Sequence, residues 1–375
     1  MPHEDGDGRH VLFLNRRDMT HPEAGGSEVF LERTTAGLVD LGWRVTVGCE
    51  RHPGSAARQL HHGVEYVRRG QGLGLYGRSA LAHLARRFGR PDVVVDVQNG
   101  MPFCSPLVTT APVVNLVHHV HREVWPVVLP APLARLGWFA EARVAPRVYR
   151  GRPYVAVSAS TRDELIALGV DPGSVTIAHN GTDVLPQPGV GRAARPTVLA
   201  VSRLVPHKRL DVAIRAVAAL RPALPDIRLV VAGAGYAEPA LRTLVADLQL
   251  EGHVDLLGWV DEATKHRLMA QAWVMAMPSL KEGWGLSVIE AAAHGTPSVA
   301  FHGAGGLSDS IVDGETGFLV AGGEDAFTRT LGTLLVDEPL RRRMRAAARA
   351  HATGFTWEAT AKAVEAVLED AMRGR

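Results

Sequence analysis

Two glutamates in the C-terminal half have a spacing that points to one shared cleft. Glu282 and Glu290 lie eight positions apart in "EGWGLSVIE", which follows an apolar run and begins a predicted helix. Residues eight apart on one helix diverge by about 80° and about 12 Å. We therefore expect Glu282 on a loop and Glu290 inside the helix, both facing one cleft. Gly283 and Gly285 allow close approach of the backbone, and a helix that begins near Leu286 directs free amides toward an anion.

Two basic residues further toward the N-terminus suit the same chemistry. Arg203 and Lys208 occur in "SRLVPHKRLD", between a predicted strand and a predicted helix. Cations at the carboxyl end of a parallel strand can neutralise a diphosphate when no metal does so. Taken alone, an ordinary solvated helix start explains these residues equally well.

Other chemistries find weaker support. "GAGYAE" at 233–238 lacks the third glycine of the dinucleotide fingerprint, and the chain contains no Walker A or H-E-x-x-H sequence. His118, His119 and His121 lie close together, but neighbours on a strand point to opposite faces, whereas catalytic zinc needs three convergent ligands. We therefore expect no metal. His118, at the end of a predicted strand that faces the cleft, is a candidate ligand-binding residue or is structural; His119 and His121 are structural or line a ligand site.

The composition predicts a two-domain globular protein. The chain has 375 residues, 46% hydrophobic and 21% charged, and a net charge of +2, which argues against a nucleic-acid partner. Cys49 and Cys104 match no zinc or disulfide pattern, so we expect a reducing cytoplasm. The sequence shows no apolar signal core and no run of about 18–20 apolar residues, so membrane contact is expected to be peripheral at most.

Two successive sets of alternating strands and helices must position these residues. The first set has predicted strands at 10–15, 43–49, 64–68, 92–97, 112–119 and 153–158, with helices at 28–42 and 160–169. The second has strands at 197–202, 227–233, 254–260, 273–279 and 297–302, with helices at 209–221, 239–250, 264–272 and 286–295. The alternation predicts two doubly wound α/β domains with parallel sheets, facing an interdomain cleft.

Three segments connect or complete these sets. Residues 185–196 are rich in proline and glycine and are expected to link the domains. Residues 122–150 mix aromatics, prolines and arginines without a sustained amphipathic pattern, which favours a bundled helix on the N-terminal domain over a lipid-contacting one. A final amphipathic helix spans 355–373, capped by Thr356.

Taken together, these motifs resemble the retaining GT-B glycosyltransferases of glycosyltransferase family 4. The resemblance rests on the Glu282/Glu290 pair, Arg203 with Lys208, "GAG" at 233–235 and "NGTD" at 180–183. "EAGGSE" at 23–28 and "VNLVHH" add a fainter N-terminal match. The sequence departs from the family pattern at Trp284, Asp309 and His207, which leaves the donor preference open.

The resemblance implies a role for each of these positions. Arg203 and Lys208 would hold the diphosphate and Glu282 the donor sugar, with His118 completing the catalytic set. Glu290 would accept hydrogen bonds from ribose hydroxyls. The remaining donor-binding positions would be Gly25, Gly26, Gly233, Gly235, Trp259, Val260, Gly285 and Leu286. No cofactor is expected beyond the substrate, a UDP or GDP sugar.

The resemblance also implies the domains and the reaction. Residues 1–186 would form an acceptor-binding domain, 187–354 a nucleotide-sugar domain, and 355–375 a helix packing back on the first. The enzyme would transfer a hexose-type sugar to an acceptor hydroxyl with retention, by metal-independent front-face attack. Acceptors consistent with the sequence are an aminosugar or aminocyclitol of secondary metabolism, a glycan and a lipid-linked sugar, which places the protein in carbohydrate or antibiotic biosynthesis. A nucleotide-sugar epimerase on the same fold and a non-catalytic carbohydrate-binding protein are the alternatives.

Overall fold

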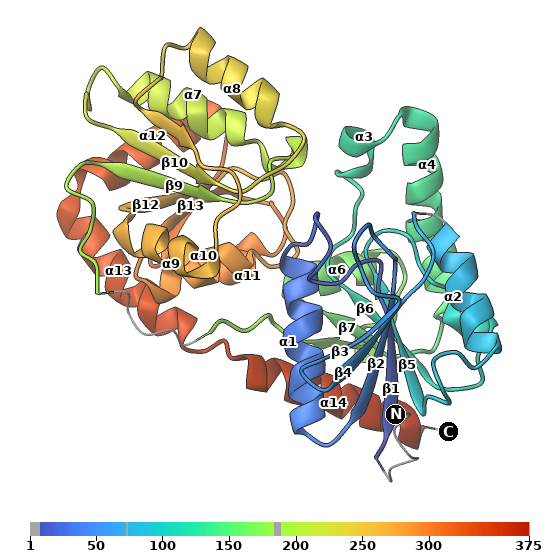
Figure 1. Ribbon diagram of the computed structural model, residues 1–375. Helices are drawn as coiled ribbons and strands as arrows, with labels where there is room; N and C mark the ends of the chain where they lie inside the picture. The colour runs from blue at the N-terminus through green and yellow to red at the C-terminus, as the bar shows by residue number, and fades with distance from the viewer. Residues whose placement is uncertain (1–7, 73, 184–188, 375) are drawn as a thin grey trace. The chain divides into compact units, whose positions relative to one another are not determined.

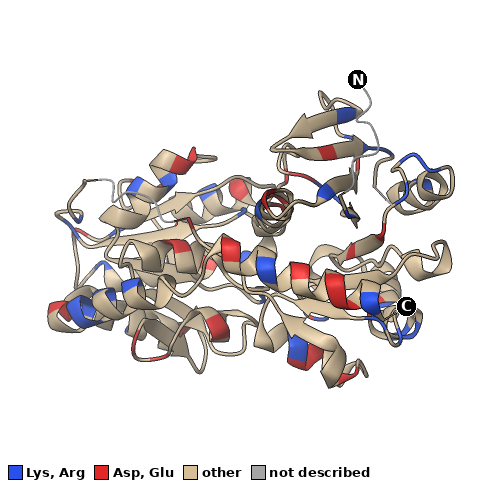
Figure 2. Cartoon of the chain, turned by 90° about the horizontal axis from the view of Figure 1, so that it is seen from below, with Lys and Arg blue, Asp and Glu red and all other residues tan. Residues whose placement is uncertain are grey.

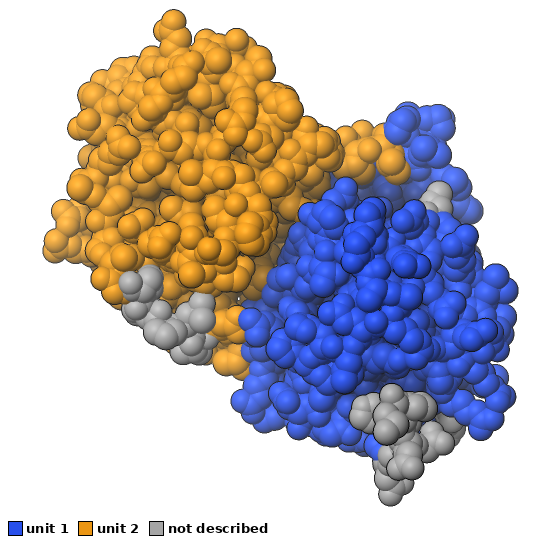
Figure 3. Space-filling view, in the orientation of Figure 1, with its two compact units in different colours: residues 1–125, 130–181, 357–375 blue, residues 126–129, 182–356 orange. Residues whose placement is uncertain are grey.

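The chain folds into two compact units, which Figure 3 colours separately. The computed structural model describes residues 8–72, 74–183 and 189–374. Unit 1 comprises Met1–Trp125, Pro130–Gly181 and Trp357–Arg375, and unit 2 comprises Pro126–Leu129 and Thr182–Thr356. The domain boundary predicted at residue 186 falls outside the described residues.

Unit 1 is built on a sheet of eight strands within the described residues, in the order β3-β4-β2-β1-β5-β6-β7-β8 (Figure 1). Their bounds are β1 His10–Leu14, β2 Arg44–Cys49, β3 Arg58–His61, β4 Val64–Arg68, β5 Val93–Gln98, β6 Val113–Val117, β7 Tyr154–Ala156 and β8 Val175–Ile177. Every neighbouring pair is parallel except β3 with β4. The predicted parallel sheet is confirmed, and β3 adds an antiparallel edge strand that was not predicted, because its four residues are all exposed and carry no apolar pattern.

The long helices of unit 1 are α1 Gly26–Asp40, α2 Gly74–Leu84, α6 Ala159–Ala167 and α14 Trp357–Arg373. The C-terminal helix α14 packs along α1, where a Cβ added to Gly37 would lie 2.6 Å from the Cβ of Ala361. The side chain of Trp43 donates from Nε1 to Glu365 at 2.9 Å, and Thr360 donates to the carbonyl of His179 at 2.6 Å. Acidic and basic residues share the length of α14 (Figure 2).

The segment at 122–150 is not one continuous helix. It consists of α3 Trp125–Val128, α4 Ala131–Phe139, a π-helical turn Ala140–Val144 and α5 Ala145–Val148. Prolines at the first turns of α4 and α5 lack the N–H that a preceding helix would need, which explains the interruptions. The helix predicted at 160–169 begins one residue earlier, at Ala159, because Ser158 caps it by accepting from the Thr161 N–H at 3.1 Å.

Unit 2 has a parallel sheet of six strands within the described residues, ordered β11-β10-β9-β12-β13-β14. This is the strand order 3-2-1-4-5-6 of a dinucleotide-type doubly wound sheet. The strands are β9 Thr197–Val201, β10 Arg228–Ala232, β11 Val254–Leu256, β12 Val274–Met277, β13 Ser298–Phe301 and β14 Gly317–Val320. The helices are α7 Leu210–Leu220, α8 Glu238–Asp247, α9 Glu262–Gln271, α10 Leu286–Ala293, α11 Leu307–Ser310, α12 Glu324–Val336 and α13 Glu338–Ala352.

Helices cover both faces of this sheet, with α7, α8 and α12 on one side and α9 and α10 on the other (Figure 1). Alternate residues of a strand point to opposite faces, so each strand contributes to two hydrophobic cores. In β9, Val198 and Ala200 join the core under α7 and α12, and Leu199 joins the core under α9 and α10. The loops that carry Arg203 and Glu282 are therefore attached to a sheet that is buried on both faces.

Part of the predicted linker belongs to unit 2. Arg192 donates to the carbonyl of His294 at 2.9 Å and to the hydroxyl of Thr296 at 2.5 Å, and it also contacts the carbonyls of Ala272 and Gly295. Burial, together with neighbouring arginines, lowers the pKa of Arg192 to about 9. Within the described residues, no helix combines the length and the apolar character needed to cross a membrane.

Candidate functional site

The loops that follow four neighbouring strands of unit 2 carry the residues singled out from its sequence. Arg203 follows β9, Gly233 follows β10, Trp259 follows β11 and Glu282 follows β12. Because β9 to β12 are mutually parallel, these loops lie at the same edge of the sheet. Open α/β sheets bind ligands beyond this edge, at the carboxyl ends of their strands.

The two glutamates occupy the predicted kinds of backbone. Glu282 lies on the loop after β12, and Glu290 lies within α10, which begins at Leu286. Gly285 caps α10 with a φ of +89°, a left-handed conformation that favours glycine, and a Cβ there would lie 2.5 Å from Leu307. The first amides of an eight-residue helix such as α10 have no intrahelical partner, so Gly285 and Leu286 present N–H groups beside Glu282.

Glu282 forms a half-buried ion pair with Lys208. Its Oε1 lies 2.6 Å from Lys208 Nζ and accepts from the hydroxyl of Ser279 at 2.7 Å. Burial alone would raise the pKa of Glu282, but the charge of Lys208 and the two hydrogen bonds outweigh it and lower the pKa. Lys208 reaches Glu282 from the end of a short 3₁₀ turn, which is followed by Arg209 in the left-handed conformation. The structure thus joins two side chains that the sequence assigned to different parts of the donor.

Glu290 forms an ion pair that the sequence analysis missed. Its Oε1 lies 2.8 Å from Lys265 Nζ on α9, and the same ammonium lies 2.8 Å from Glu262. Burial raises the pKa of Glu290, and the attraction of Lys265 offsets this only in part. Lys265 stands one turn inside α9 without a motif around it, so only the packing of α9 on α10 brings the two together.

Two clusters have ligand atoms close enough to hold a metal ion among the described residues. One is Glu262, His266 and Glu290, and the other is Glu32 with His61 and His62 on the surface of unit 1. In the first cluster, Lys265 already lies within ion-pair distance of both carboxylates. A cation there would have to compete with that ammonium, so the donor set fits a divalent metal poorly.

The glycines of the "GAG" stretch allow two loops to interlock. A Cβ on Gly233 would lie 1.9 Å from the carbonyl oxygen of Ser202, and one on Gly235 would lie 2.3 Å from that of Leu204. The N–H of Leu204 donates to the carbonyl of Ala234 at 2.9 Å. These contacts fix the backbone on either side of Arg203. Within the described part of the chain, the guanidinium of Arg203 has no ion-pair partner.

A second glycine pair holds the loop of Glu282. A Cβ on Gly305 would lie 2.4 Å from the carbonyl oxygen of Glu282, and one on Gly306 would lie 2.0 Å from that of Gly283. The N–H of Glu282 donates to Ala304 at 3.1 Å, and the N–H of Gly306 donates to Glu282 at 2.9 Å. Both bonds join Glu282 to the same segment, and together they form an isolated parallel β-bridge between Glu282 and Gly305.

The predicted base-binding segment is the most open part of this edge. Trp259 is 77% exposed and Val260 is half-buried, between β11 and α9. The preceding Gly258 accepts from the N–H of Gly233 at 2.8 Å, which ties this segment to the "GAG" loop. Trp284, by contrast, is buried and packs edge-on against Phe355 with ring centroids 4.9 Å apart. It therefore belongs to the core behind the loop.

His118 lies in unit 1 directly after β6, and its side chain is buried against Phe30 with ring centroids 5.2 Å apart. Burial, with a smaller contribution from His121, lowers the pKa of His118 to about 3, so the ring is neutral. Among the described residues, its buried Nε2 has no hydrogen-bond partner. His119 and His121 stack on each other with ring centroids 3.9 Å apart.

A buried carboxylate that the sequence analysis missed holds the segment after His118. Glu141, in the π-helical turn, is 1% exposed. It accepts from the backbone N–H of His121 at 3.0 Å and from the indole of Trp125 at 2.9 Å, and it contacts His121 Nδ1 at 3.0 Å. No motif surrounds Glu141 in this arginine-rich segment, so the sequence gives no signal of this role.

The first-loop glycines differ from their predicted role in one respect. The N–H of Gly25 donates to the carboxylate of Glu28 at 2.8 Å, which also accepts from Ser27 at 2.9 Å. This capping arrangement uses the Gly25 amide that was expected to bind phosphate. Gly26 is the first residue of α1.

Comparisons with known proteins place this geometry in a class. Residues 187–351 match the model of the Glycosyl transferases group 1, and residues 24–184 match that of Glycosyltransferase Family 4. Among solved structures, sucrose-phosphate synthase from Thermosynechococcus elongatus superposes with a TM-score of 0.82 at 19% identity, covering 98% of this chain and 100% of that one. HepE from Anabaena, solved with UDP and glucose, gives 0.75 at 21%, covering 96% and 100%. The fold is therefore the GT-B fold of glycosyltransferases.

Curated relatives define the family more closely. A GDP-mannose-dependent alpha-(1-6)-phosphatidylinositol monomannoside mannosyltransferase of Mycolicibacterium smegmatis is 31% identical over 340 residues, which is 84% of this chain and 87% of the relative. The chain belongs to glycosyltransferase family 4, whose members are retaining enzymes. D-inositol 3-phosphate glycosyltransferases of Streptomyces scabiei and Mycobacterium avium are 35% and 37% identical over 65% and 54% of this chain. The matches span only 58% and 51% of those two relatives.

Proposed function

We propose that this protein transfers a hexose-type sugar from a nucleoside diphosphate sugar to an acceptor hydroxyl, with retention of the anomeric configuration. The observation that carries the proposal is the Lys208–Glu282 ion pair at the carboxyl edge of unit 2, on the same edge as Arg203. Two cations and a carboxylate at that edge suit a diphosphate joined to a polyhydroxylated sugar.

Arg203 and Lys208 would neutralise the diphosphate and stabilise the charge that grows on it as the glycosidic bond breaks. Such electrostatic stabilisation, aimed at charge that develops in the transition state, is usually the largest catalytic term. The free amides of Gly285 and Leu286 would add donors to the same charge. Since these groups supply the positive charge, the proposed transfer needs no metal.

The two carboxylates would hold the ends of the donor. Glu282 is ionised because Lys208 lowers its pKa, so it can accept hydrogen bonds from sugar hydroxyls. Glu290, held by Lys265, would accept from the ribose, and Trp259 with Val260 would contact the base. Among these residues none is placed as a nucleophile, which supports front-face attack with the leaving phosphate as base.

The names of the relatives suggest which substrates to test first. One relative is named as GDP-mannose-dependent and acts on a phosphatidylinositol monomannoside, and the others are named for D-inositol 3-phosphate. We propose GDP-mannose as the first donor and a cyclitol-containing molecule as the first acceptor. The sequence alone was consistent with several classes of acceptor, of which an aminocyclitol was one. This choice narrows those acceptors to molecules that contain a cyclitol.

We also propose that residues 1–186 form the acceptor-binding domain and that residues 187–354 form the donor-binding domain. Residues 355–375 would complete the N-terminal domain as a helix that packs back on it. His118 and the His119–His121 stack would line the acceptor side. The neutral ring of His118 can donate or accept one hydrogen bond to a sugar hydroxyl without adding charge.

The test is a panel of UDP and GDP sugars screened for donor hydrolysis, followed by acceptors screened by mass spectrometry. We expect release of free nucleotide together with a product that is heavier than the acceptor by one hexose. A change of sugar configuration on an intact nucleotide sugar would identify the epimerase alternative. Binding of donors without any turnover across the panel would identify the carbohydrate-binding alternative and contradict the proposal.

A further inference from the structure

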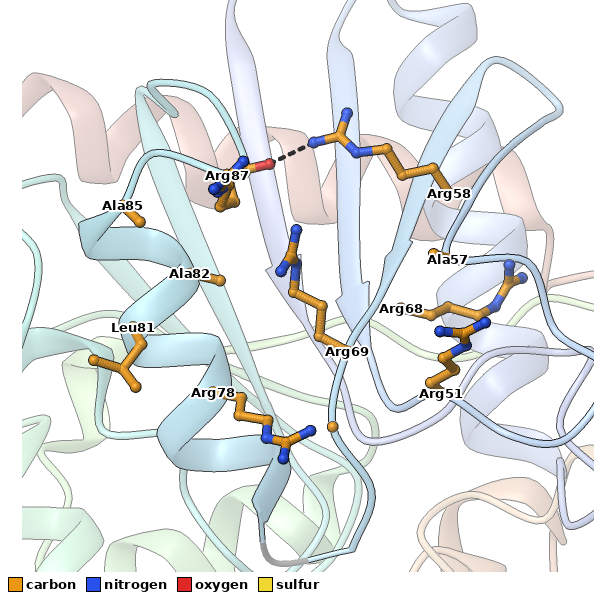
Figure 4. Close-up of a pocket in the computed structure, with 11 residues that line it drawn as sticks. Arg51, Ala57, Arg58, Arg68, Arg69, Arg78, Leu81, Ala82, Ala85 and Arg87 are labelled. Atoms are coloured by element: carbon orange, nitrogen blue, oxygen red, sulfur yellow. Dashed lines mark hydrogen bonds between the residues drawn. The ribbon is translucent and has the colours of Figure 1, made fainter.

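Unit 1 contains a cavity lined mainly by arginine. It has a volume of about 550 Å³ and lies between α2 and the β3–β4 edge of the sheet (Figure 4). The apolar part of its wall comes from Leu81 and Ala82 on α2, from Ala85 directly after it, and from Ala57 before β3. Six arginines contribute to the lining: Arg51, Arg58, Arg68, Arg69, Arg78 and Arg87.

Two of these arginines are already paired with carboxylates. Arg58 lies 2.6 Å from Glu65, and Arg68 is buried and contacts Asp18 at 2.5 Å. Arg68 also donates to the carbonyl of Ala56 at 3.1 Å. These two guanidinium groups are held in place by the protein and need no further anion.

The other four have no such partner. Within the described residues, Arg51, Arg69, Arg78 and Arg87 form no ion pair with a carboxylate. The Nε of Arg69 is buried and has no hydrogen-bond acceptor in that part of the chain. Figure 4 shows the side chains of Arg69 and Arg78 directed into the space between α2 and β4. Positive charges that converge without a counter-charge repel one another, so an added anion would stabilise the site.

The cavity also suits the shape of a small ligand. Its volume lies within the usual range of about 300–1,000 Å³ for small-molecule sites. Ala82 and Ala85 keep the wall on α2 short, which leaves the arginines room to approach a ligand from the opposite side. Guanidinium groups bind phosphate oxygens in pairs, which makes phosphate the best match for a cluster of arginines. None of the described residues that line the cavity is aromatic, so these residues offer no stacking surface of the kind that single-stranded nucleic acid uses.

We propose that this cavity binds a compact ligand that carries at least two phosphate groups. The proposal does not depend on the proposed function, because none of the donor-site residues lines the cavity. The same chemistry is offered by a soluble phosphorylated metabolite and by the head group of a phosphorylated lipid. The experiment below separates these two sources.

Inorganic pyrophosphate serves as the probe, with binding to the full chain measured by isothermal titration calorimetry. Because pyrophosphate would also bind at Arg203 and Lys208, every measurement uses a background with Arg203→Gln and Lys208→Gln. Adding Arg69→Gln and Arg78→Gln should weaken the remaining binding by about tenfold for each arginine removed. The control is Arg152→Gln, an exposed arginine of the same unit outside the cavity, which should leave the affinity unchanged.

Circular dichroism establishes that each variant is folded. Because Arg78 is exposed, Arg78→Gln alone provides a second test that should disturb the structure little.

Vesicles of phosphatidylcholine with and without a phosphoinositide then distinguish a lipid head group from a soluble ligand. Arg69-dependent sedimentation with phosphoinositide vesicles that pyrophosphate displaces assigns a lipid head group, whereas Arg69-dependent binding of pyrophosphate without any sedimentation assigns a soluble ligand. Equal pyrophosphate affinity in the Arg69→Gln/Arg78→Gln and Arg152→Gln proteins would overturn the proposal. Loss of donor turnover on changing Lys208 bears only on the proposed function.

Discussion

The Nζ of Lys208 lies 2.6 Å from Oε1 of Glu282, although 74 residues separate them in sequence. Both side chains are largely shielded from solvent, with 13% and 12% exposed. The pair therefore keeps one cation and one carboxylate at the same point, and the charge of Lys208 helps to lower the pKa of Glu282. Replacing Lys208 removes that contribution.

Removing the lysine should abolish most of the transfer activity. In Lys208→Met, the diphosphate loses a cation and Glu282 loses its counter-charge, so we expect at least a hundredfold decrease in kcat/KM. Glu282→Ala should have an effect of similar size. The free energy of unfolding should fall by about 2 kcal/mol in Lys208→Met, because a charged hydrogen bond is lost. Steady-state kinetics and urea denaturation measure these two effects.

The matched control is Lys362→Met on α14. Lys362 forms the same kind of pair with Glu358, but both side chains are exposed, so neither activity nor stability should change measurably. Near-normal turnover in Lys208→Met would remove Lys208 and Glu282 from the proposed mechanism.

Glu282 and Glu290 should affect acid stability in opposite directions. The pKa of Glu282 in the folded protein is below its ordinary value of 4.5, so its contribution is present above about pH 4.5 and is lost as the pH falls further. The pKa of Glu290 is raised, so the ionised group opposes folding at neutral pH and this cost disappears as the pH falls toward 4.5. As the pH falls below 4.5, wild type should therefore lose stability relative to Glu282→Gln. As the pH falls from neutral to 4.5, wild type should gain stability relative to Glu290→Gln.

Melting temperatures measured from pH 3.5 to 7.5 for the three proteins test these slopes. Parallel curves for wild type and both variants would show that the ion pairs do not control the two carboxyl groups.

A methyl group at Gly306 should disturb the loop of Glu282. Gly306 has a φ of −60°, which alanine adopts without strain, but its Cβ would lie 2.0 Å from the carbonyl oxygen of Gly283. The collision involves backbone on both sides, so we expect a loss of about 1–3 kcal/mol in stability, as for other overpacked sites, together with lower activity. Chemical denaturation and donor hydrolysis provide the measurements.

Gly323→Ala is the comparison, because the space around Gly323 is open and its φ is −90°. If Gly306→Ala were as stable and active as Gly323→Ala, the close contact between Gly306 and Gly283 could not be what positions Glu282.

Glu141 should act on the acceptor side as a positioning residue. Glu141→Gln removes the negative charge that accepts from His121 and Trp125, so the segment between them should loosen. We expect the KM for acceptor to rise several-fold, while hydrolysis of the donor in the absence of acceptor stays unchanged. Glu123→Gln, an exposed acid in the same segment, is the control. An equal loss of donor hydrolysis and transfer would indicate a general structural defect instead.

Periodic apolar patterns predicted most of the strands and the doubly wound class. β3 was missed because its exposed residues have no apolar face, and it is held in place by pairing with β4. Among the site residues, Glu282 and Lys208 stood out because glycines and a strand end surround them. Lys265 and Glu141 did not, because each acts through a neighbour that only tertiary packing brings near. Sequence patterns report the local backbone, whereas partners from distant elements require the fold.

Helix α14 belongs to unit 1 although it is the last element of the chain. During synthesis on the ribosome, the strands of unit 1 emerge first, but Val364, Val367 and Leu368, which are buried in that unit, emerge only after all of unit 2. The surface of unit 1 under α14 therefore stays uncovered until α14 itself has been synthesised. A contiguous gene fragment that stops before residue 357 would encode unit 1 without α14, the helix that packs along α1.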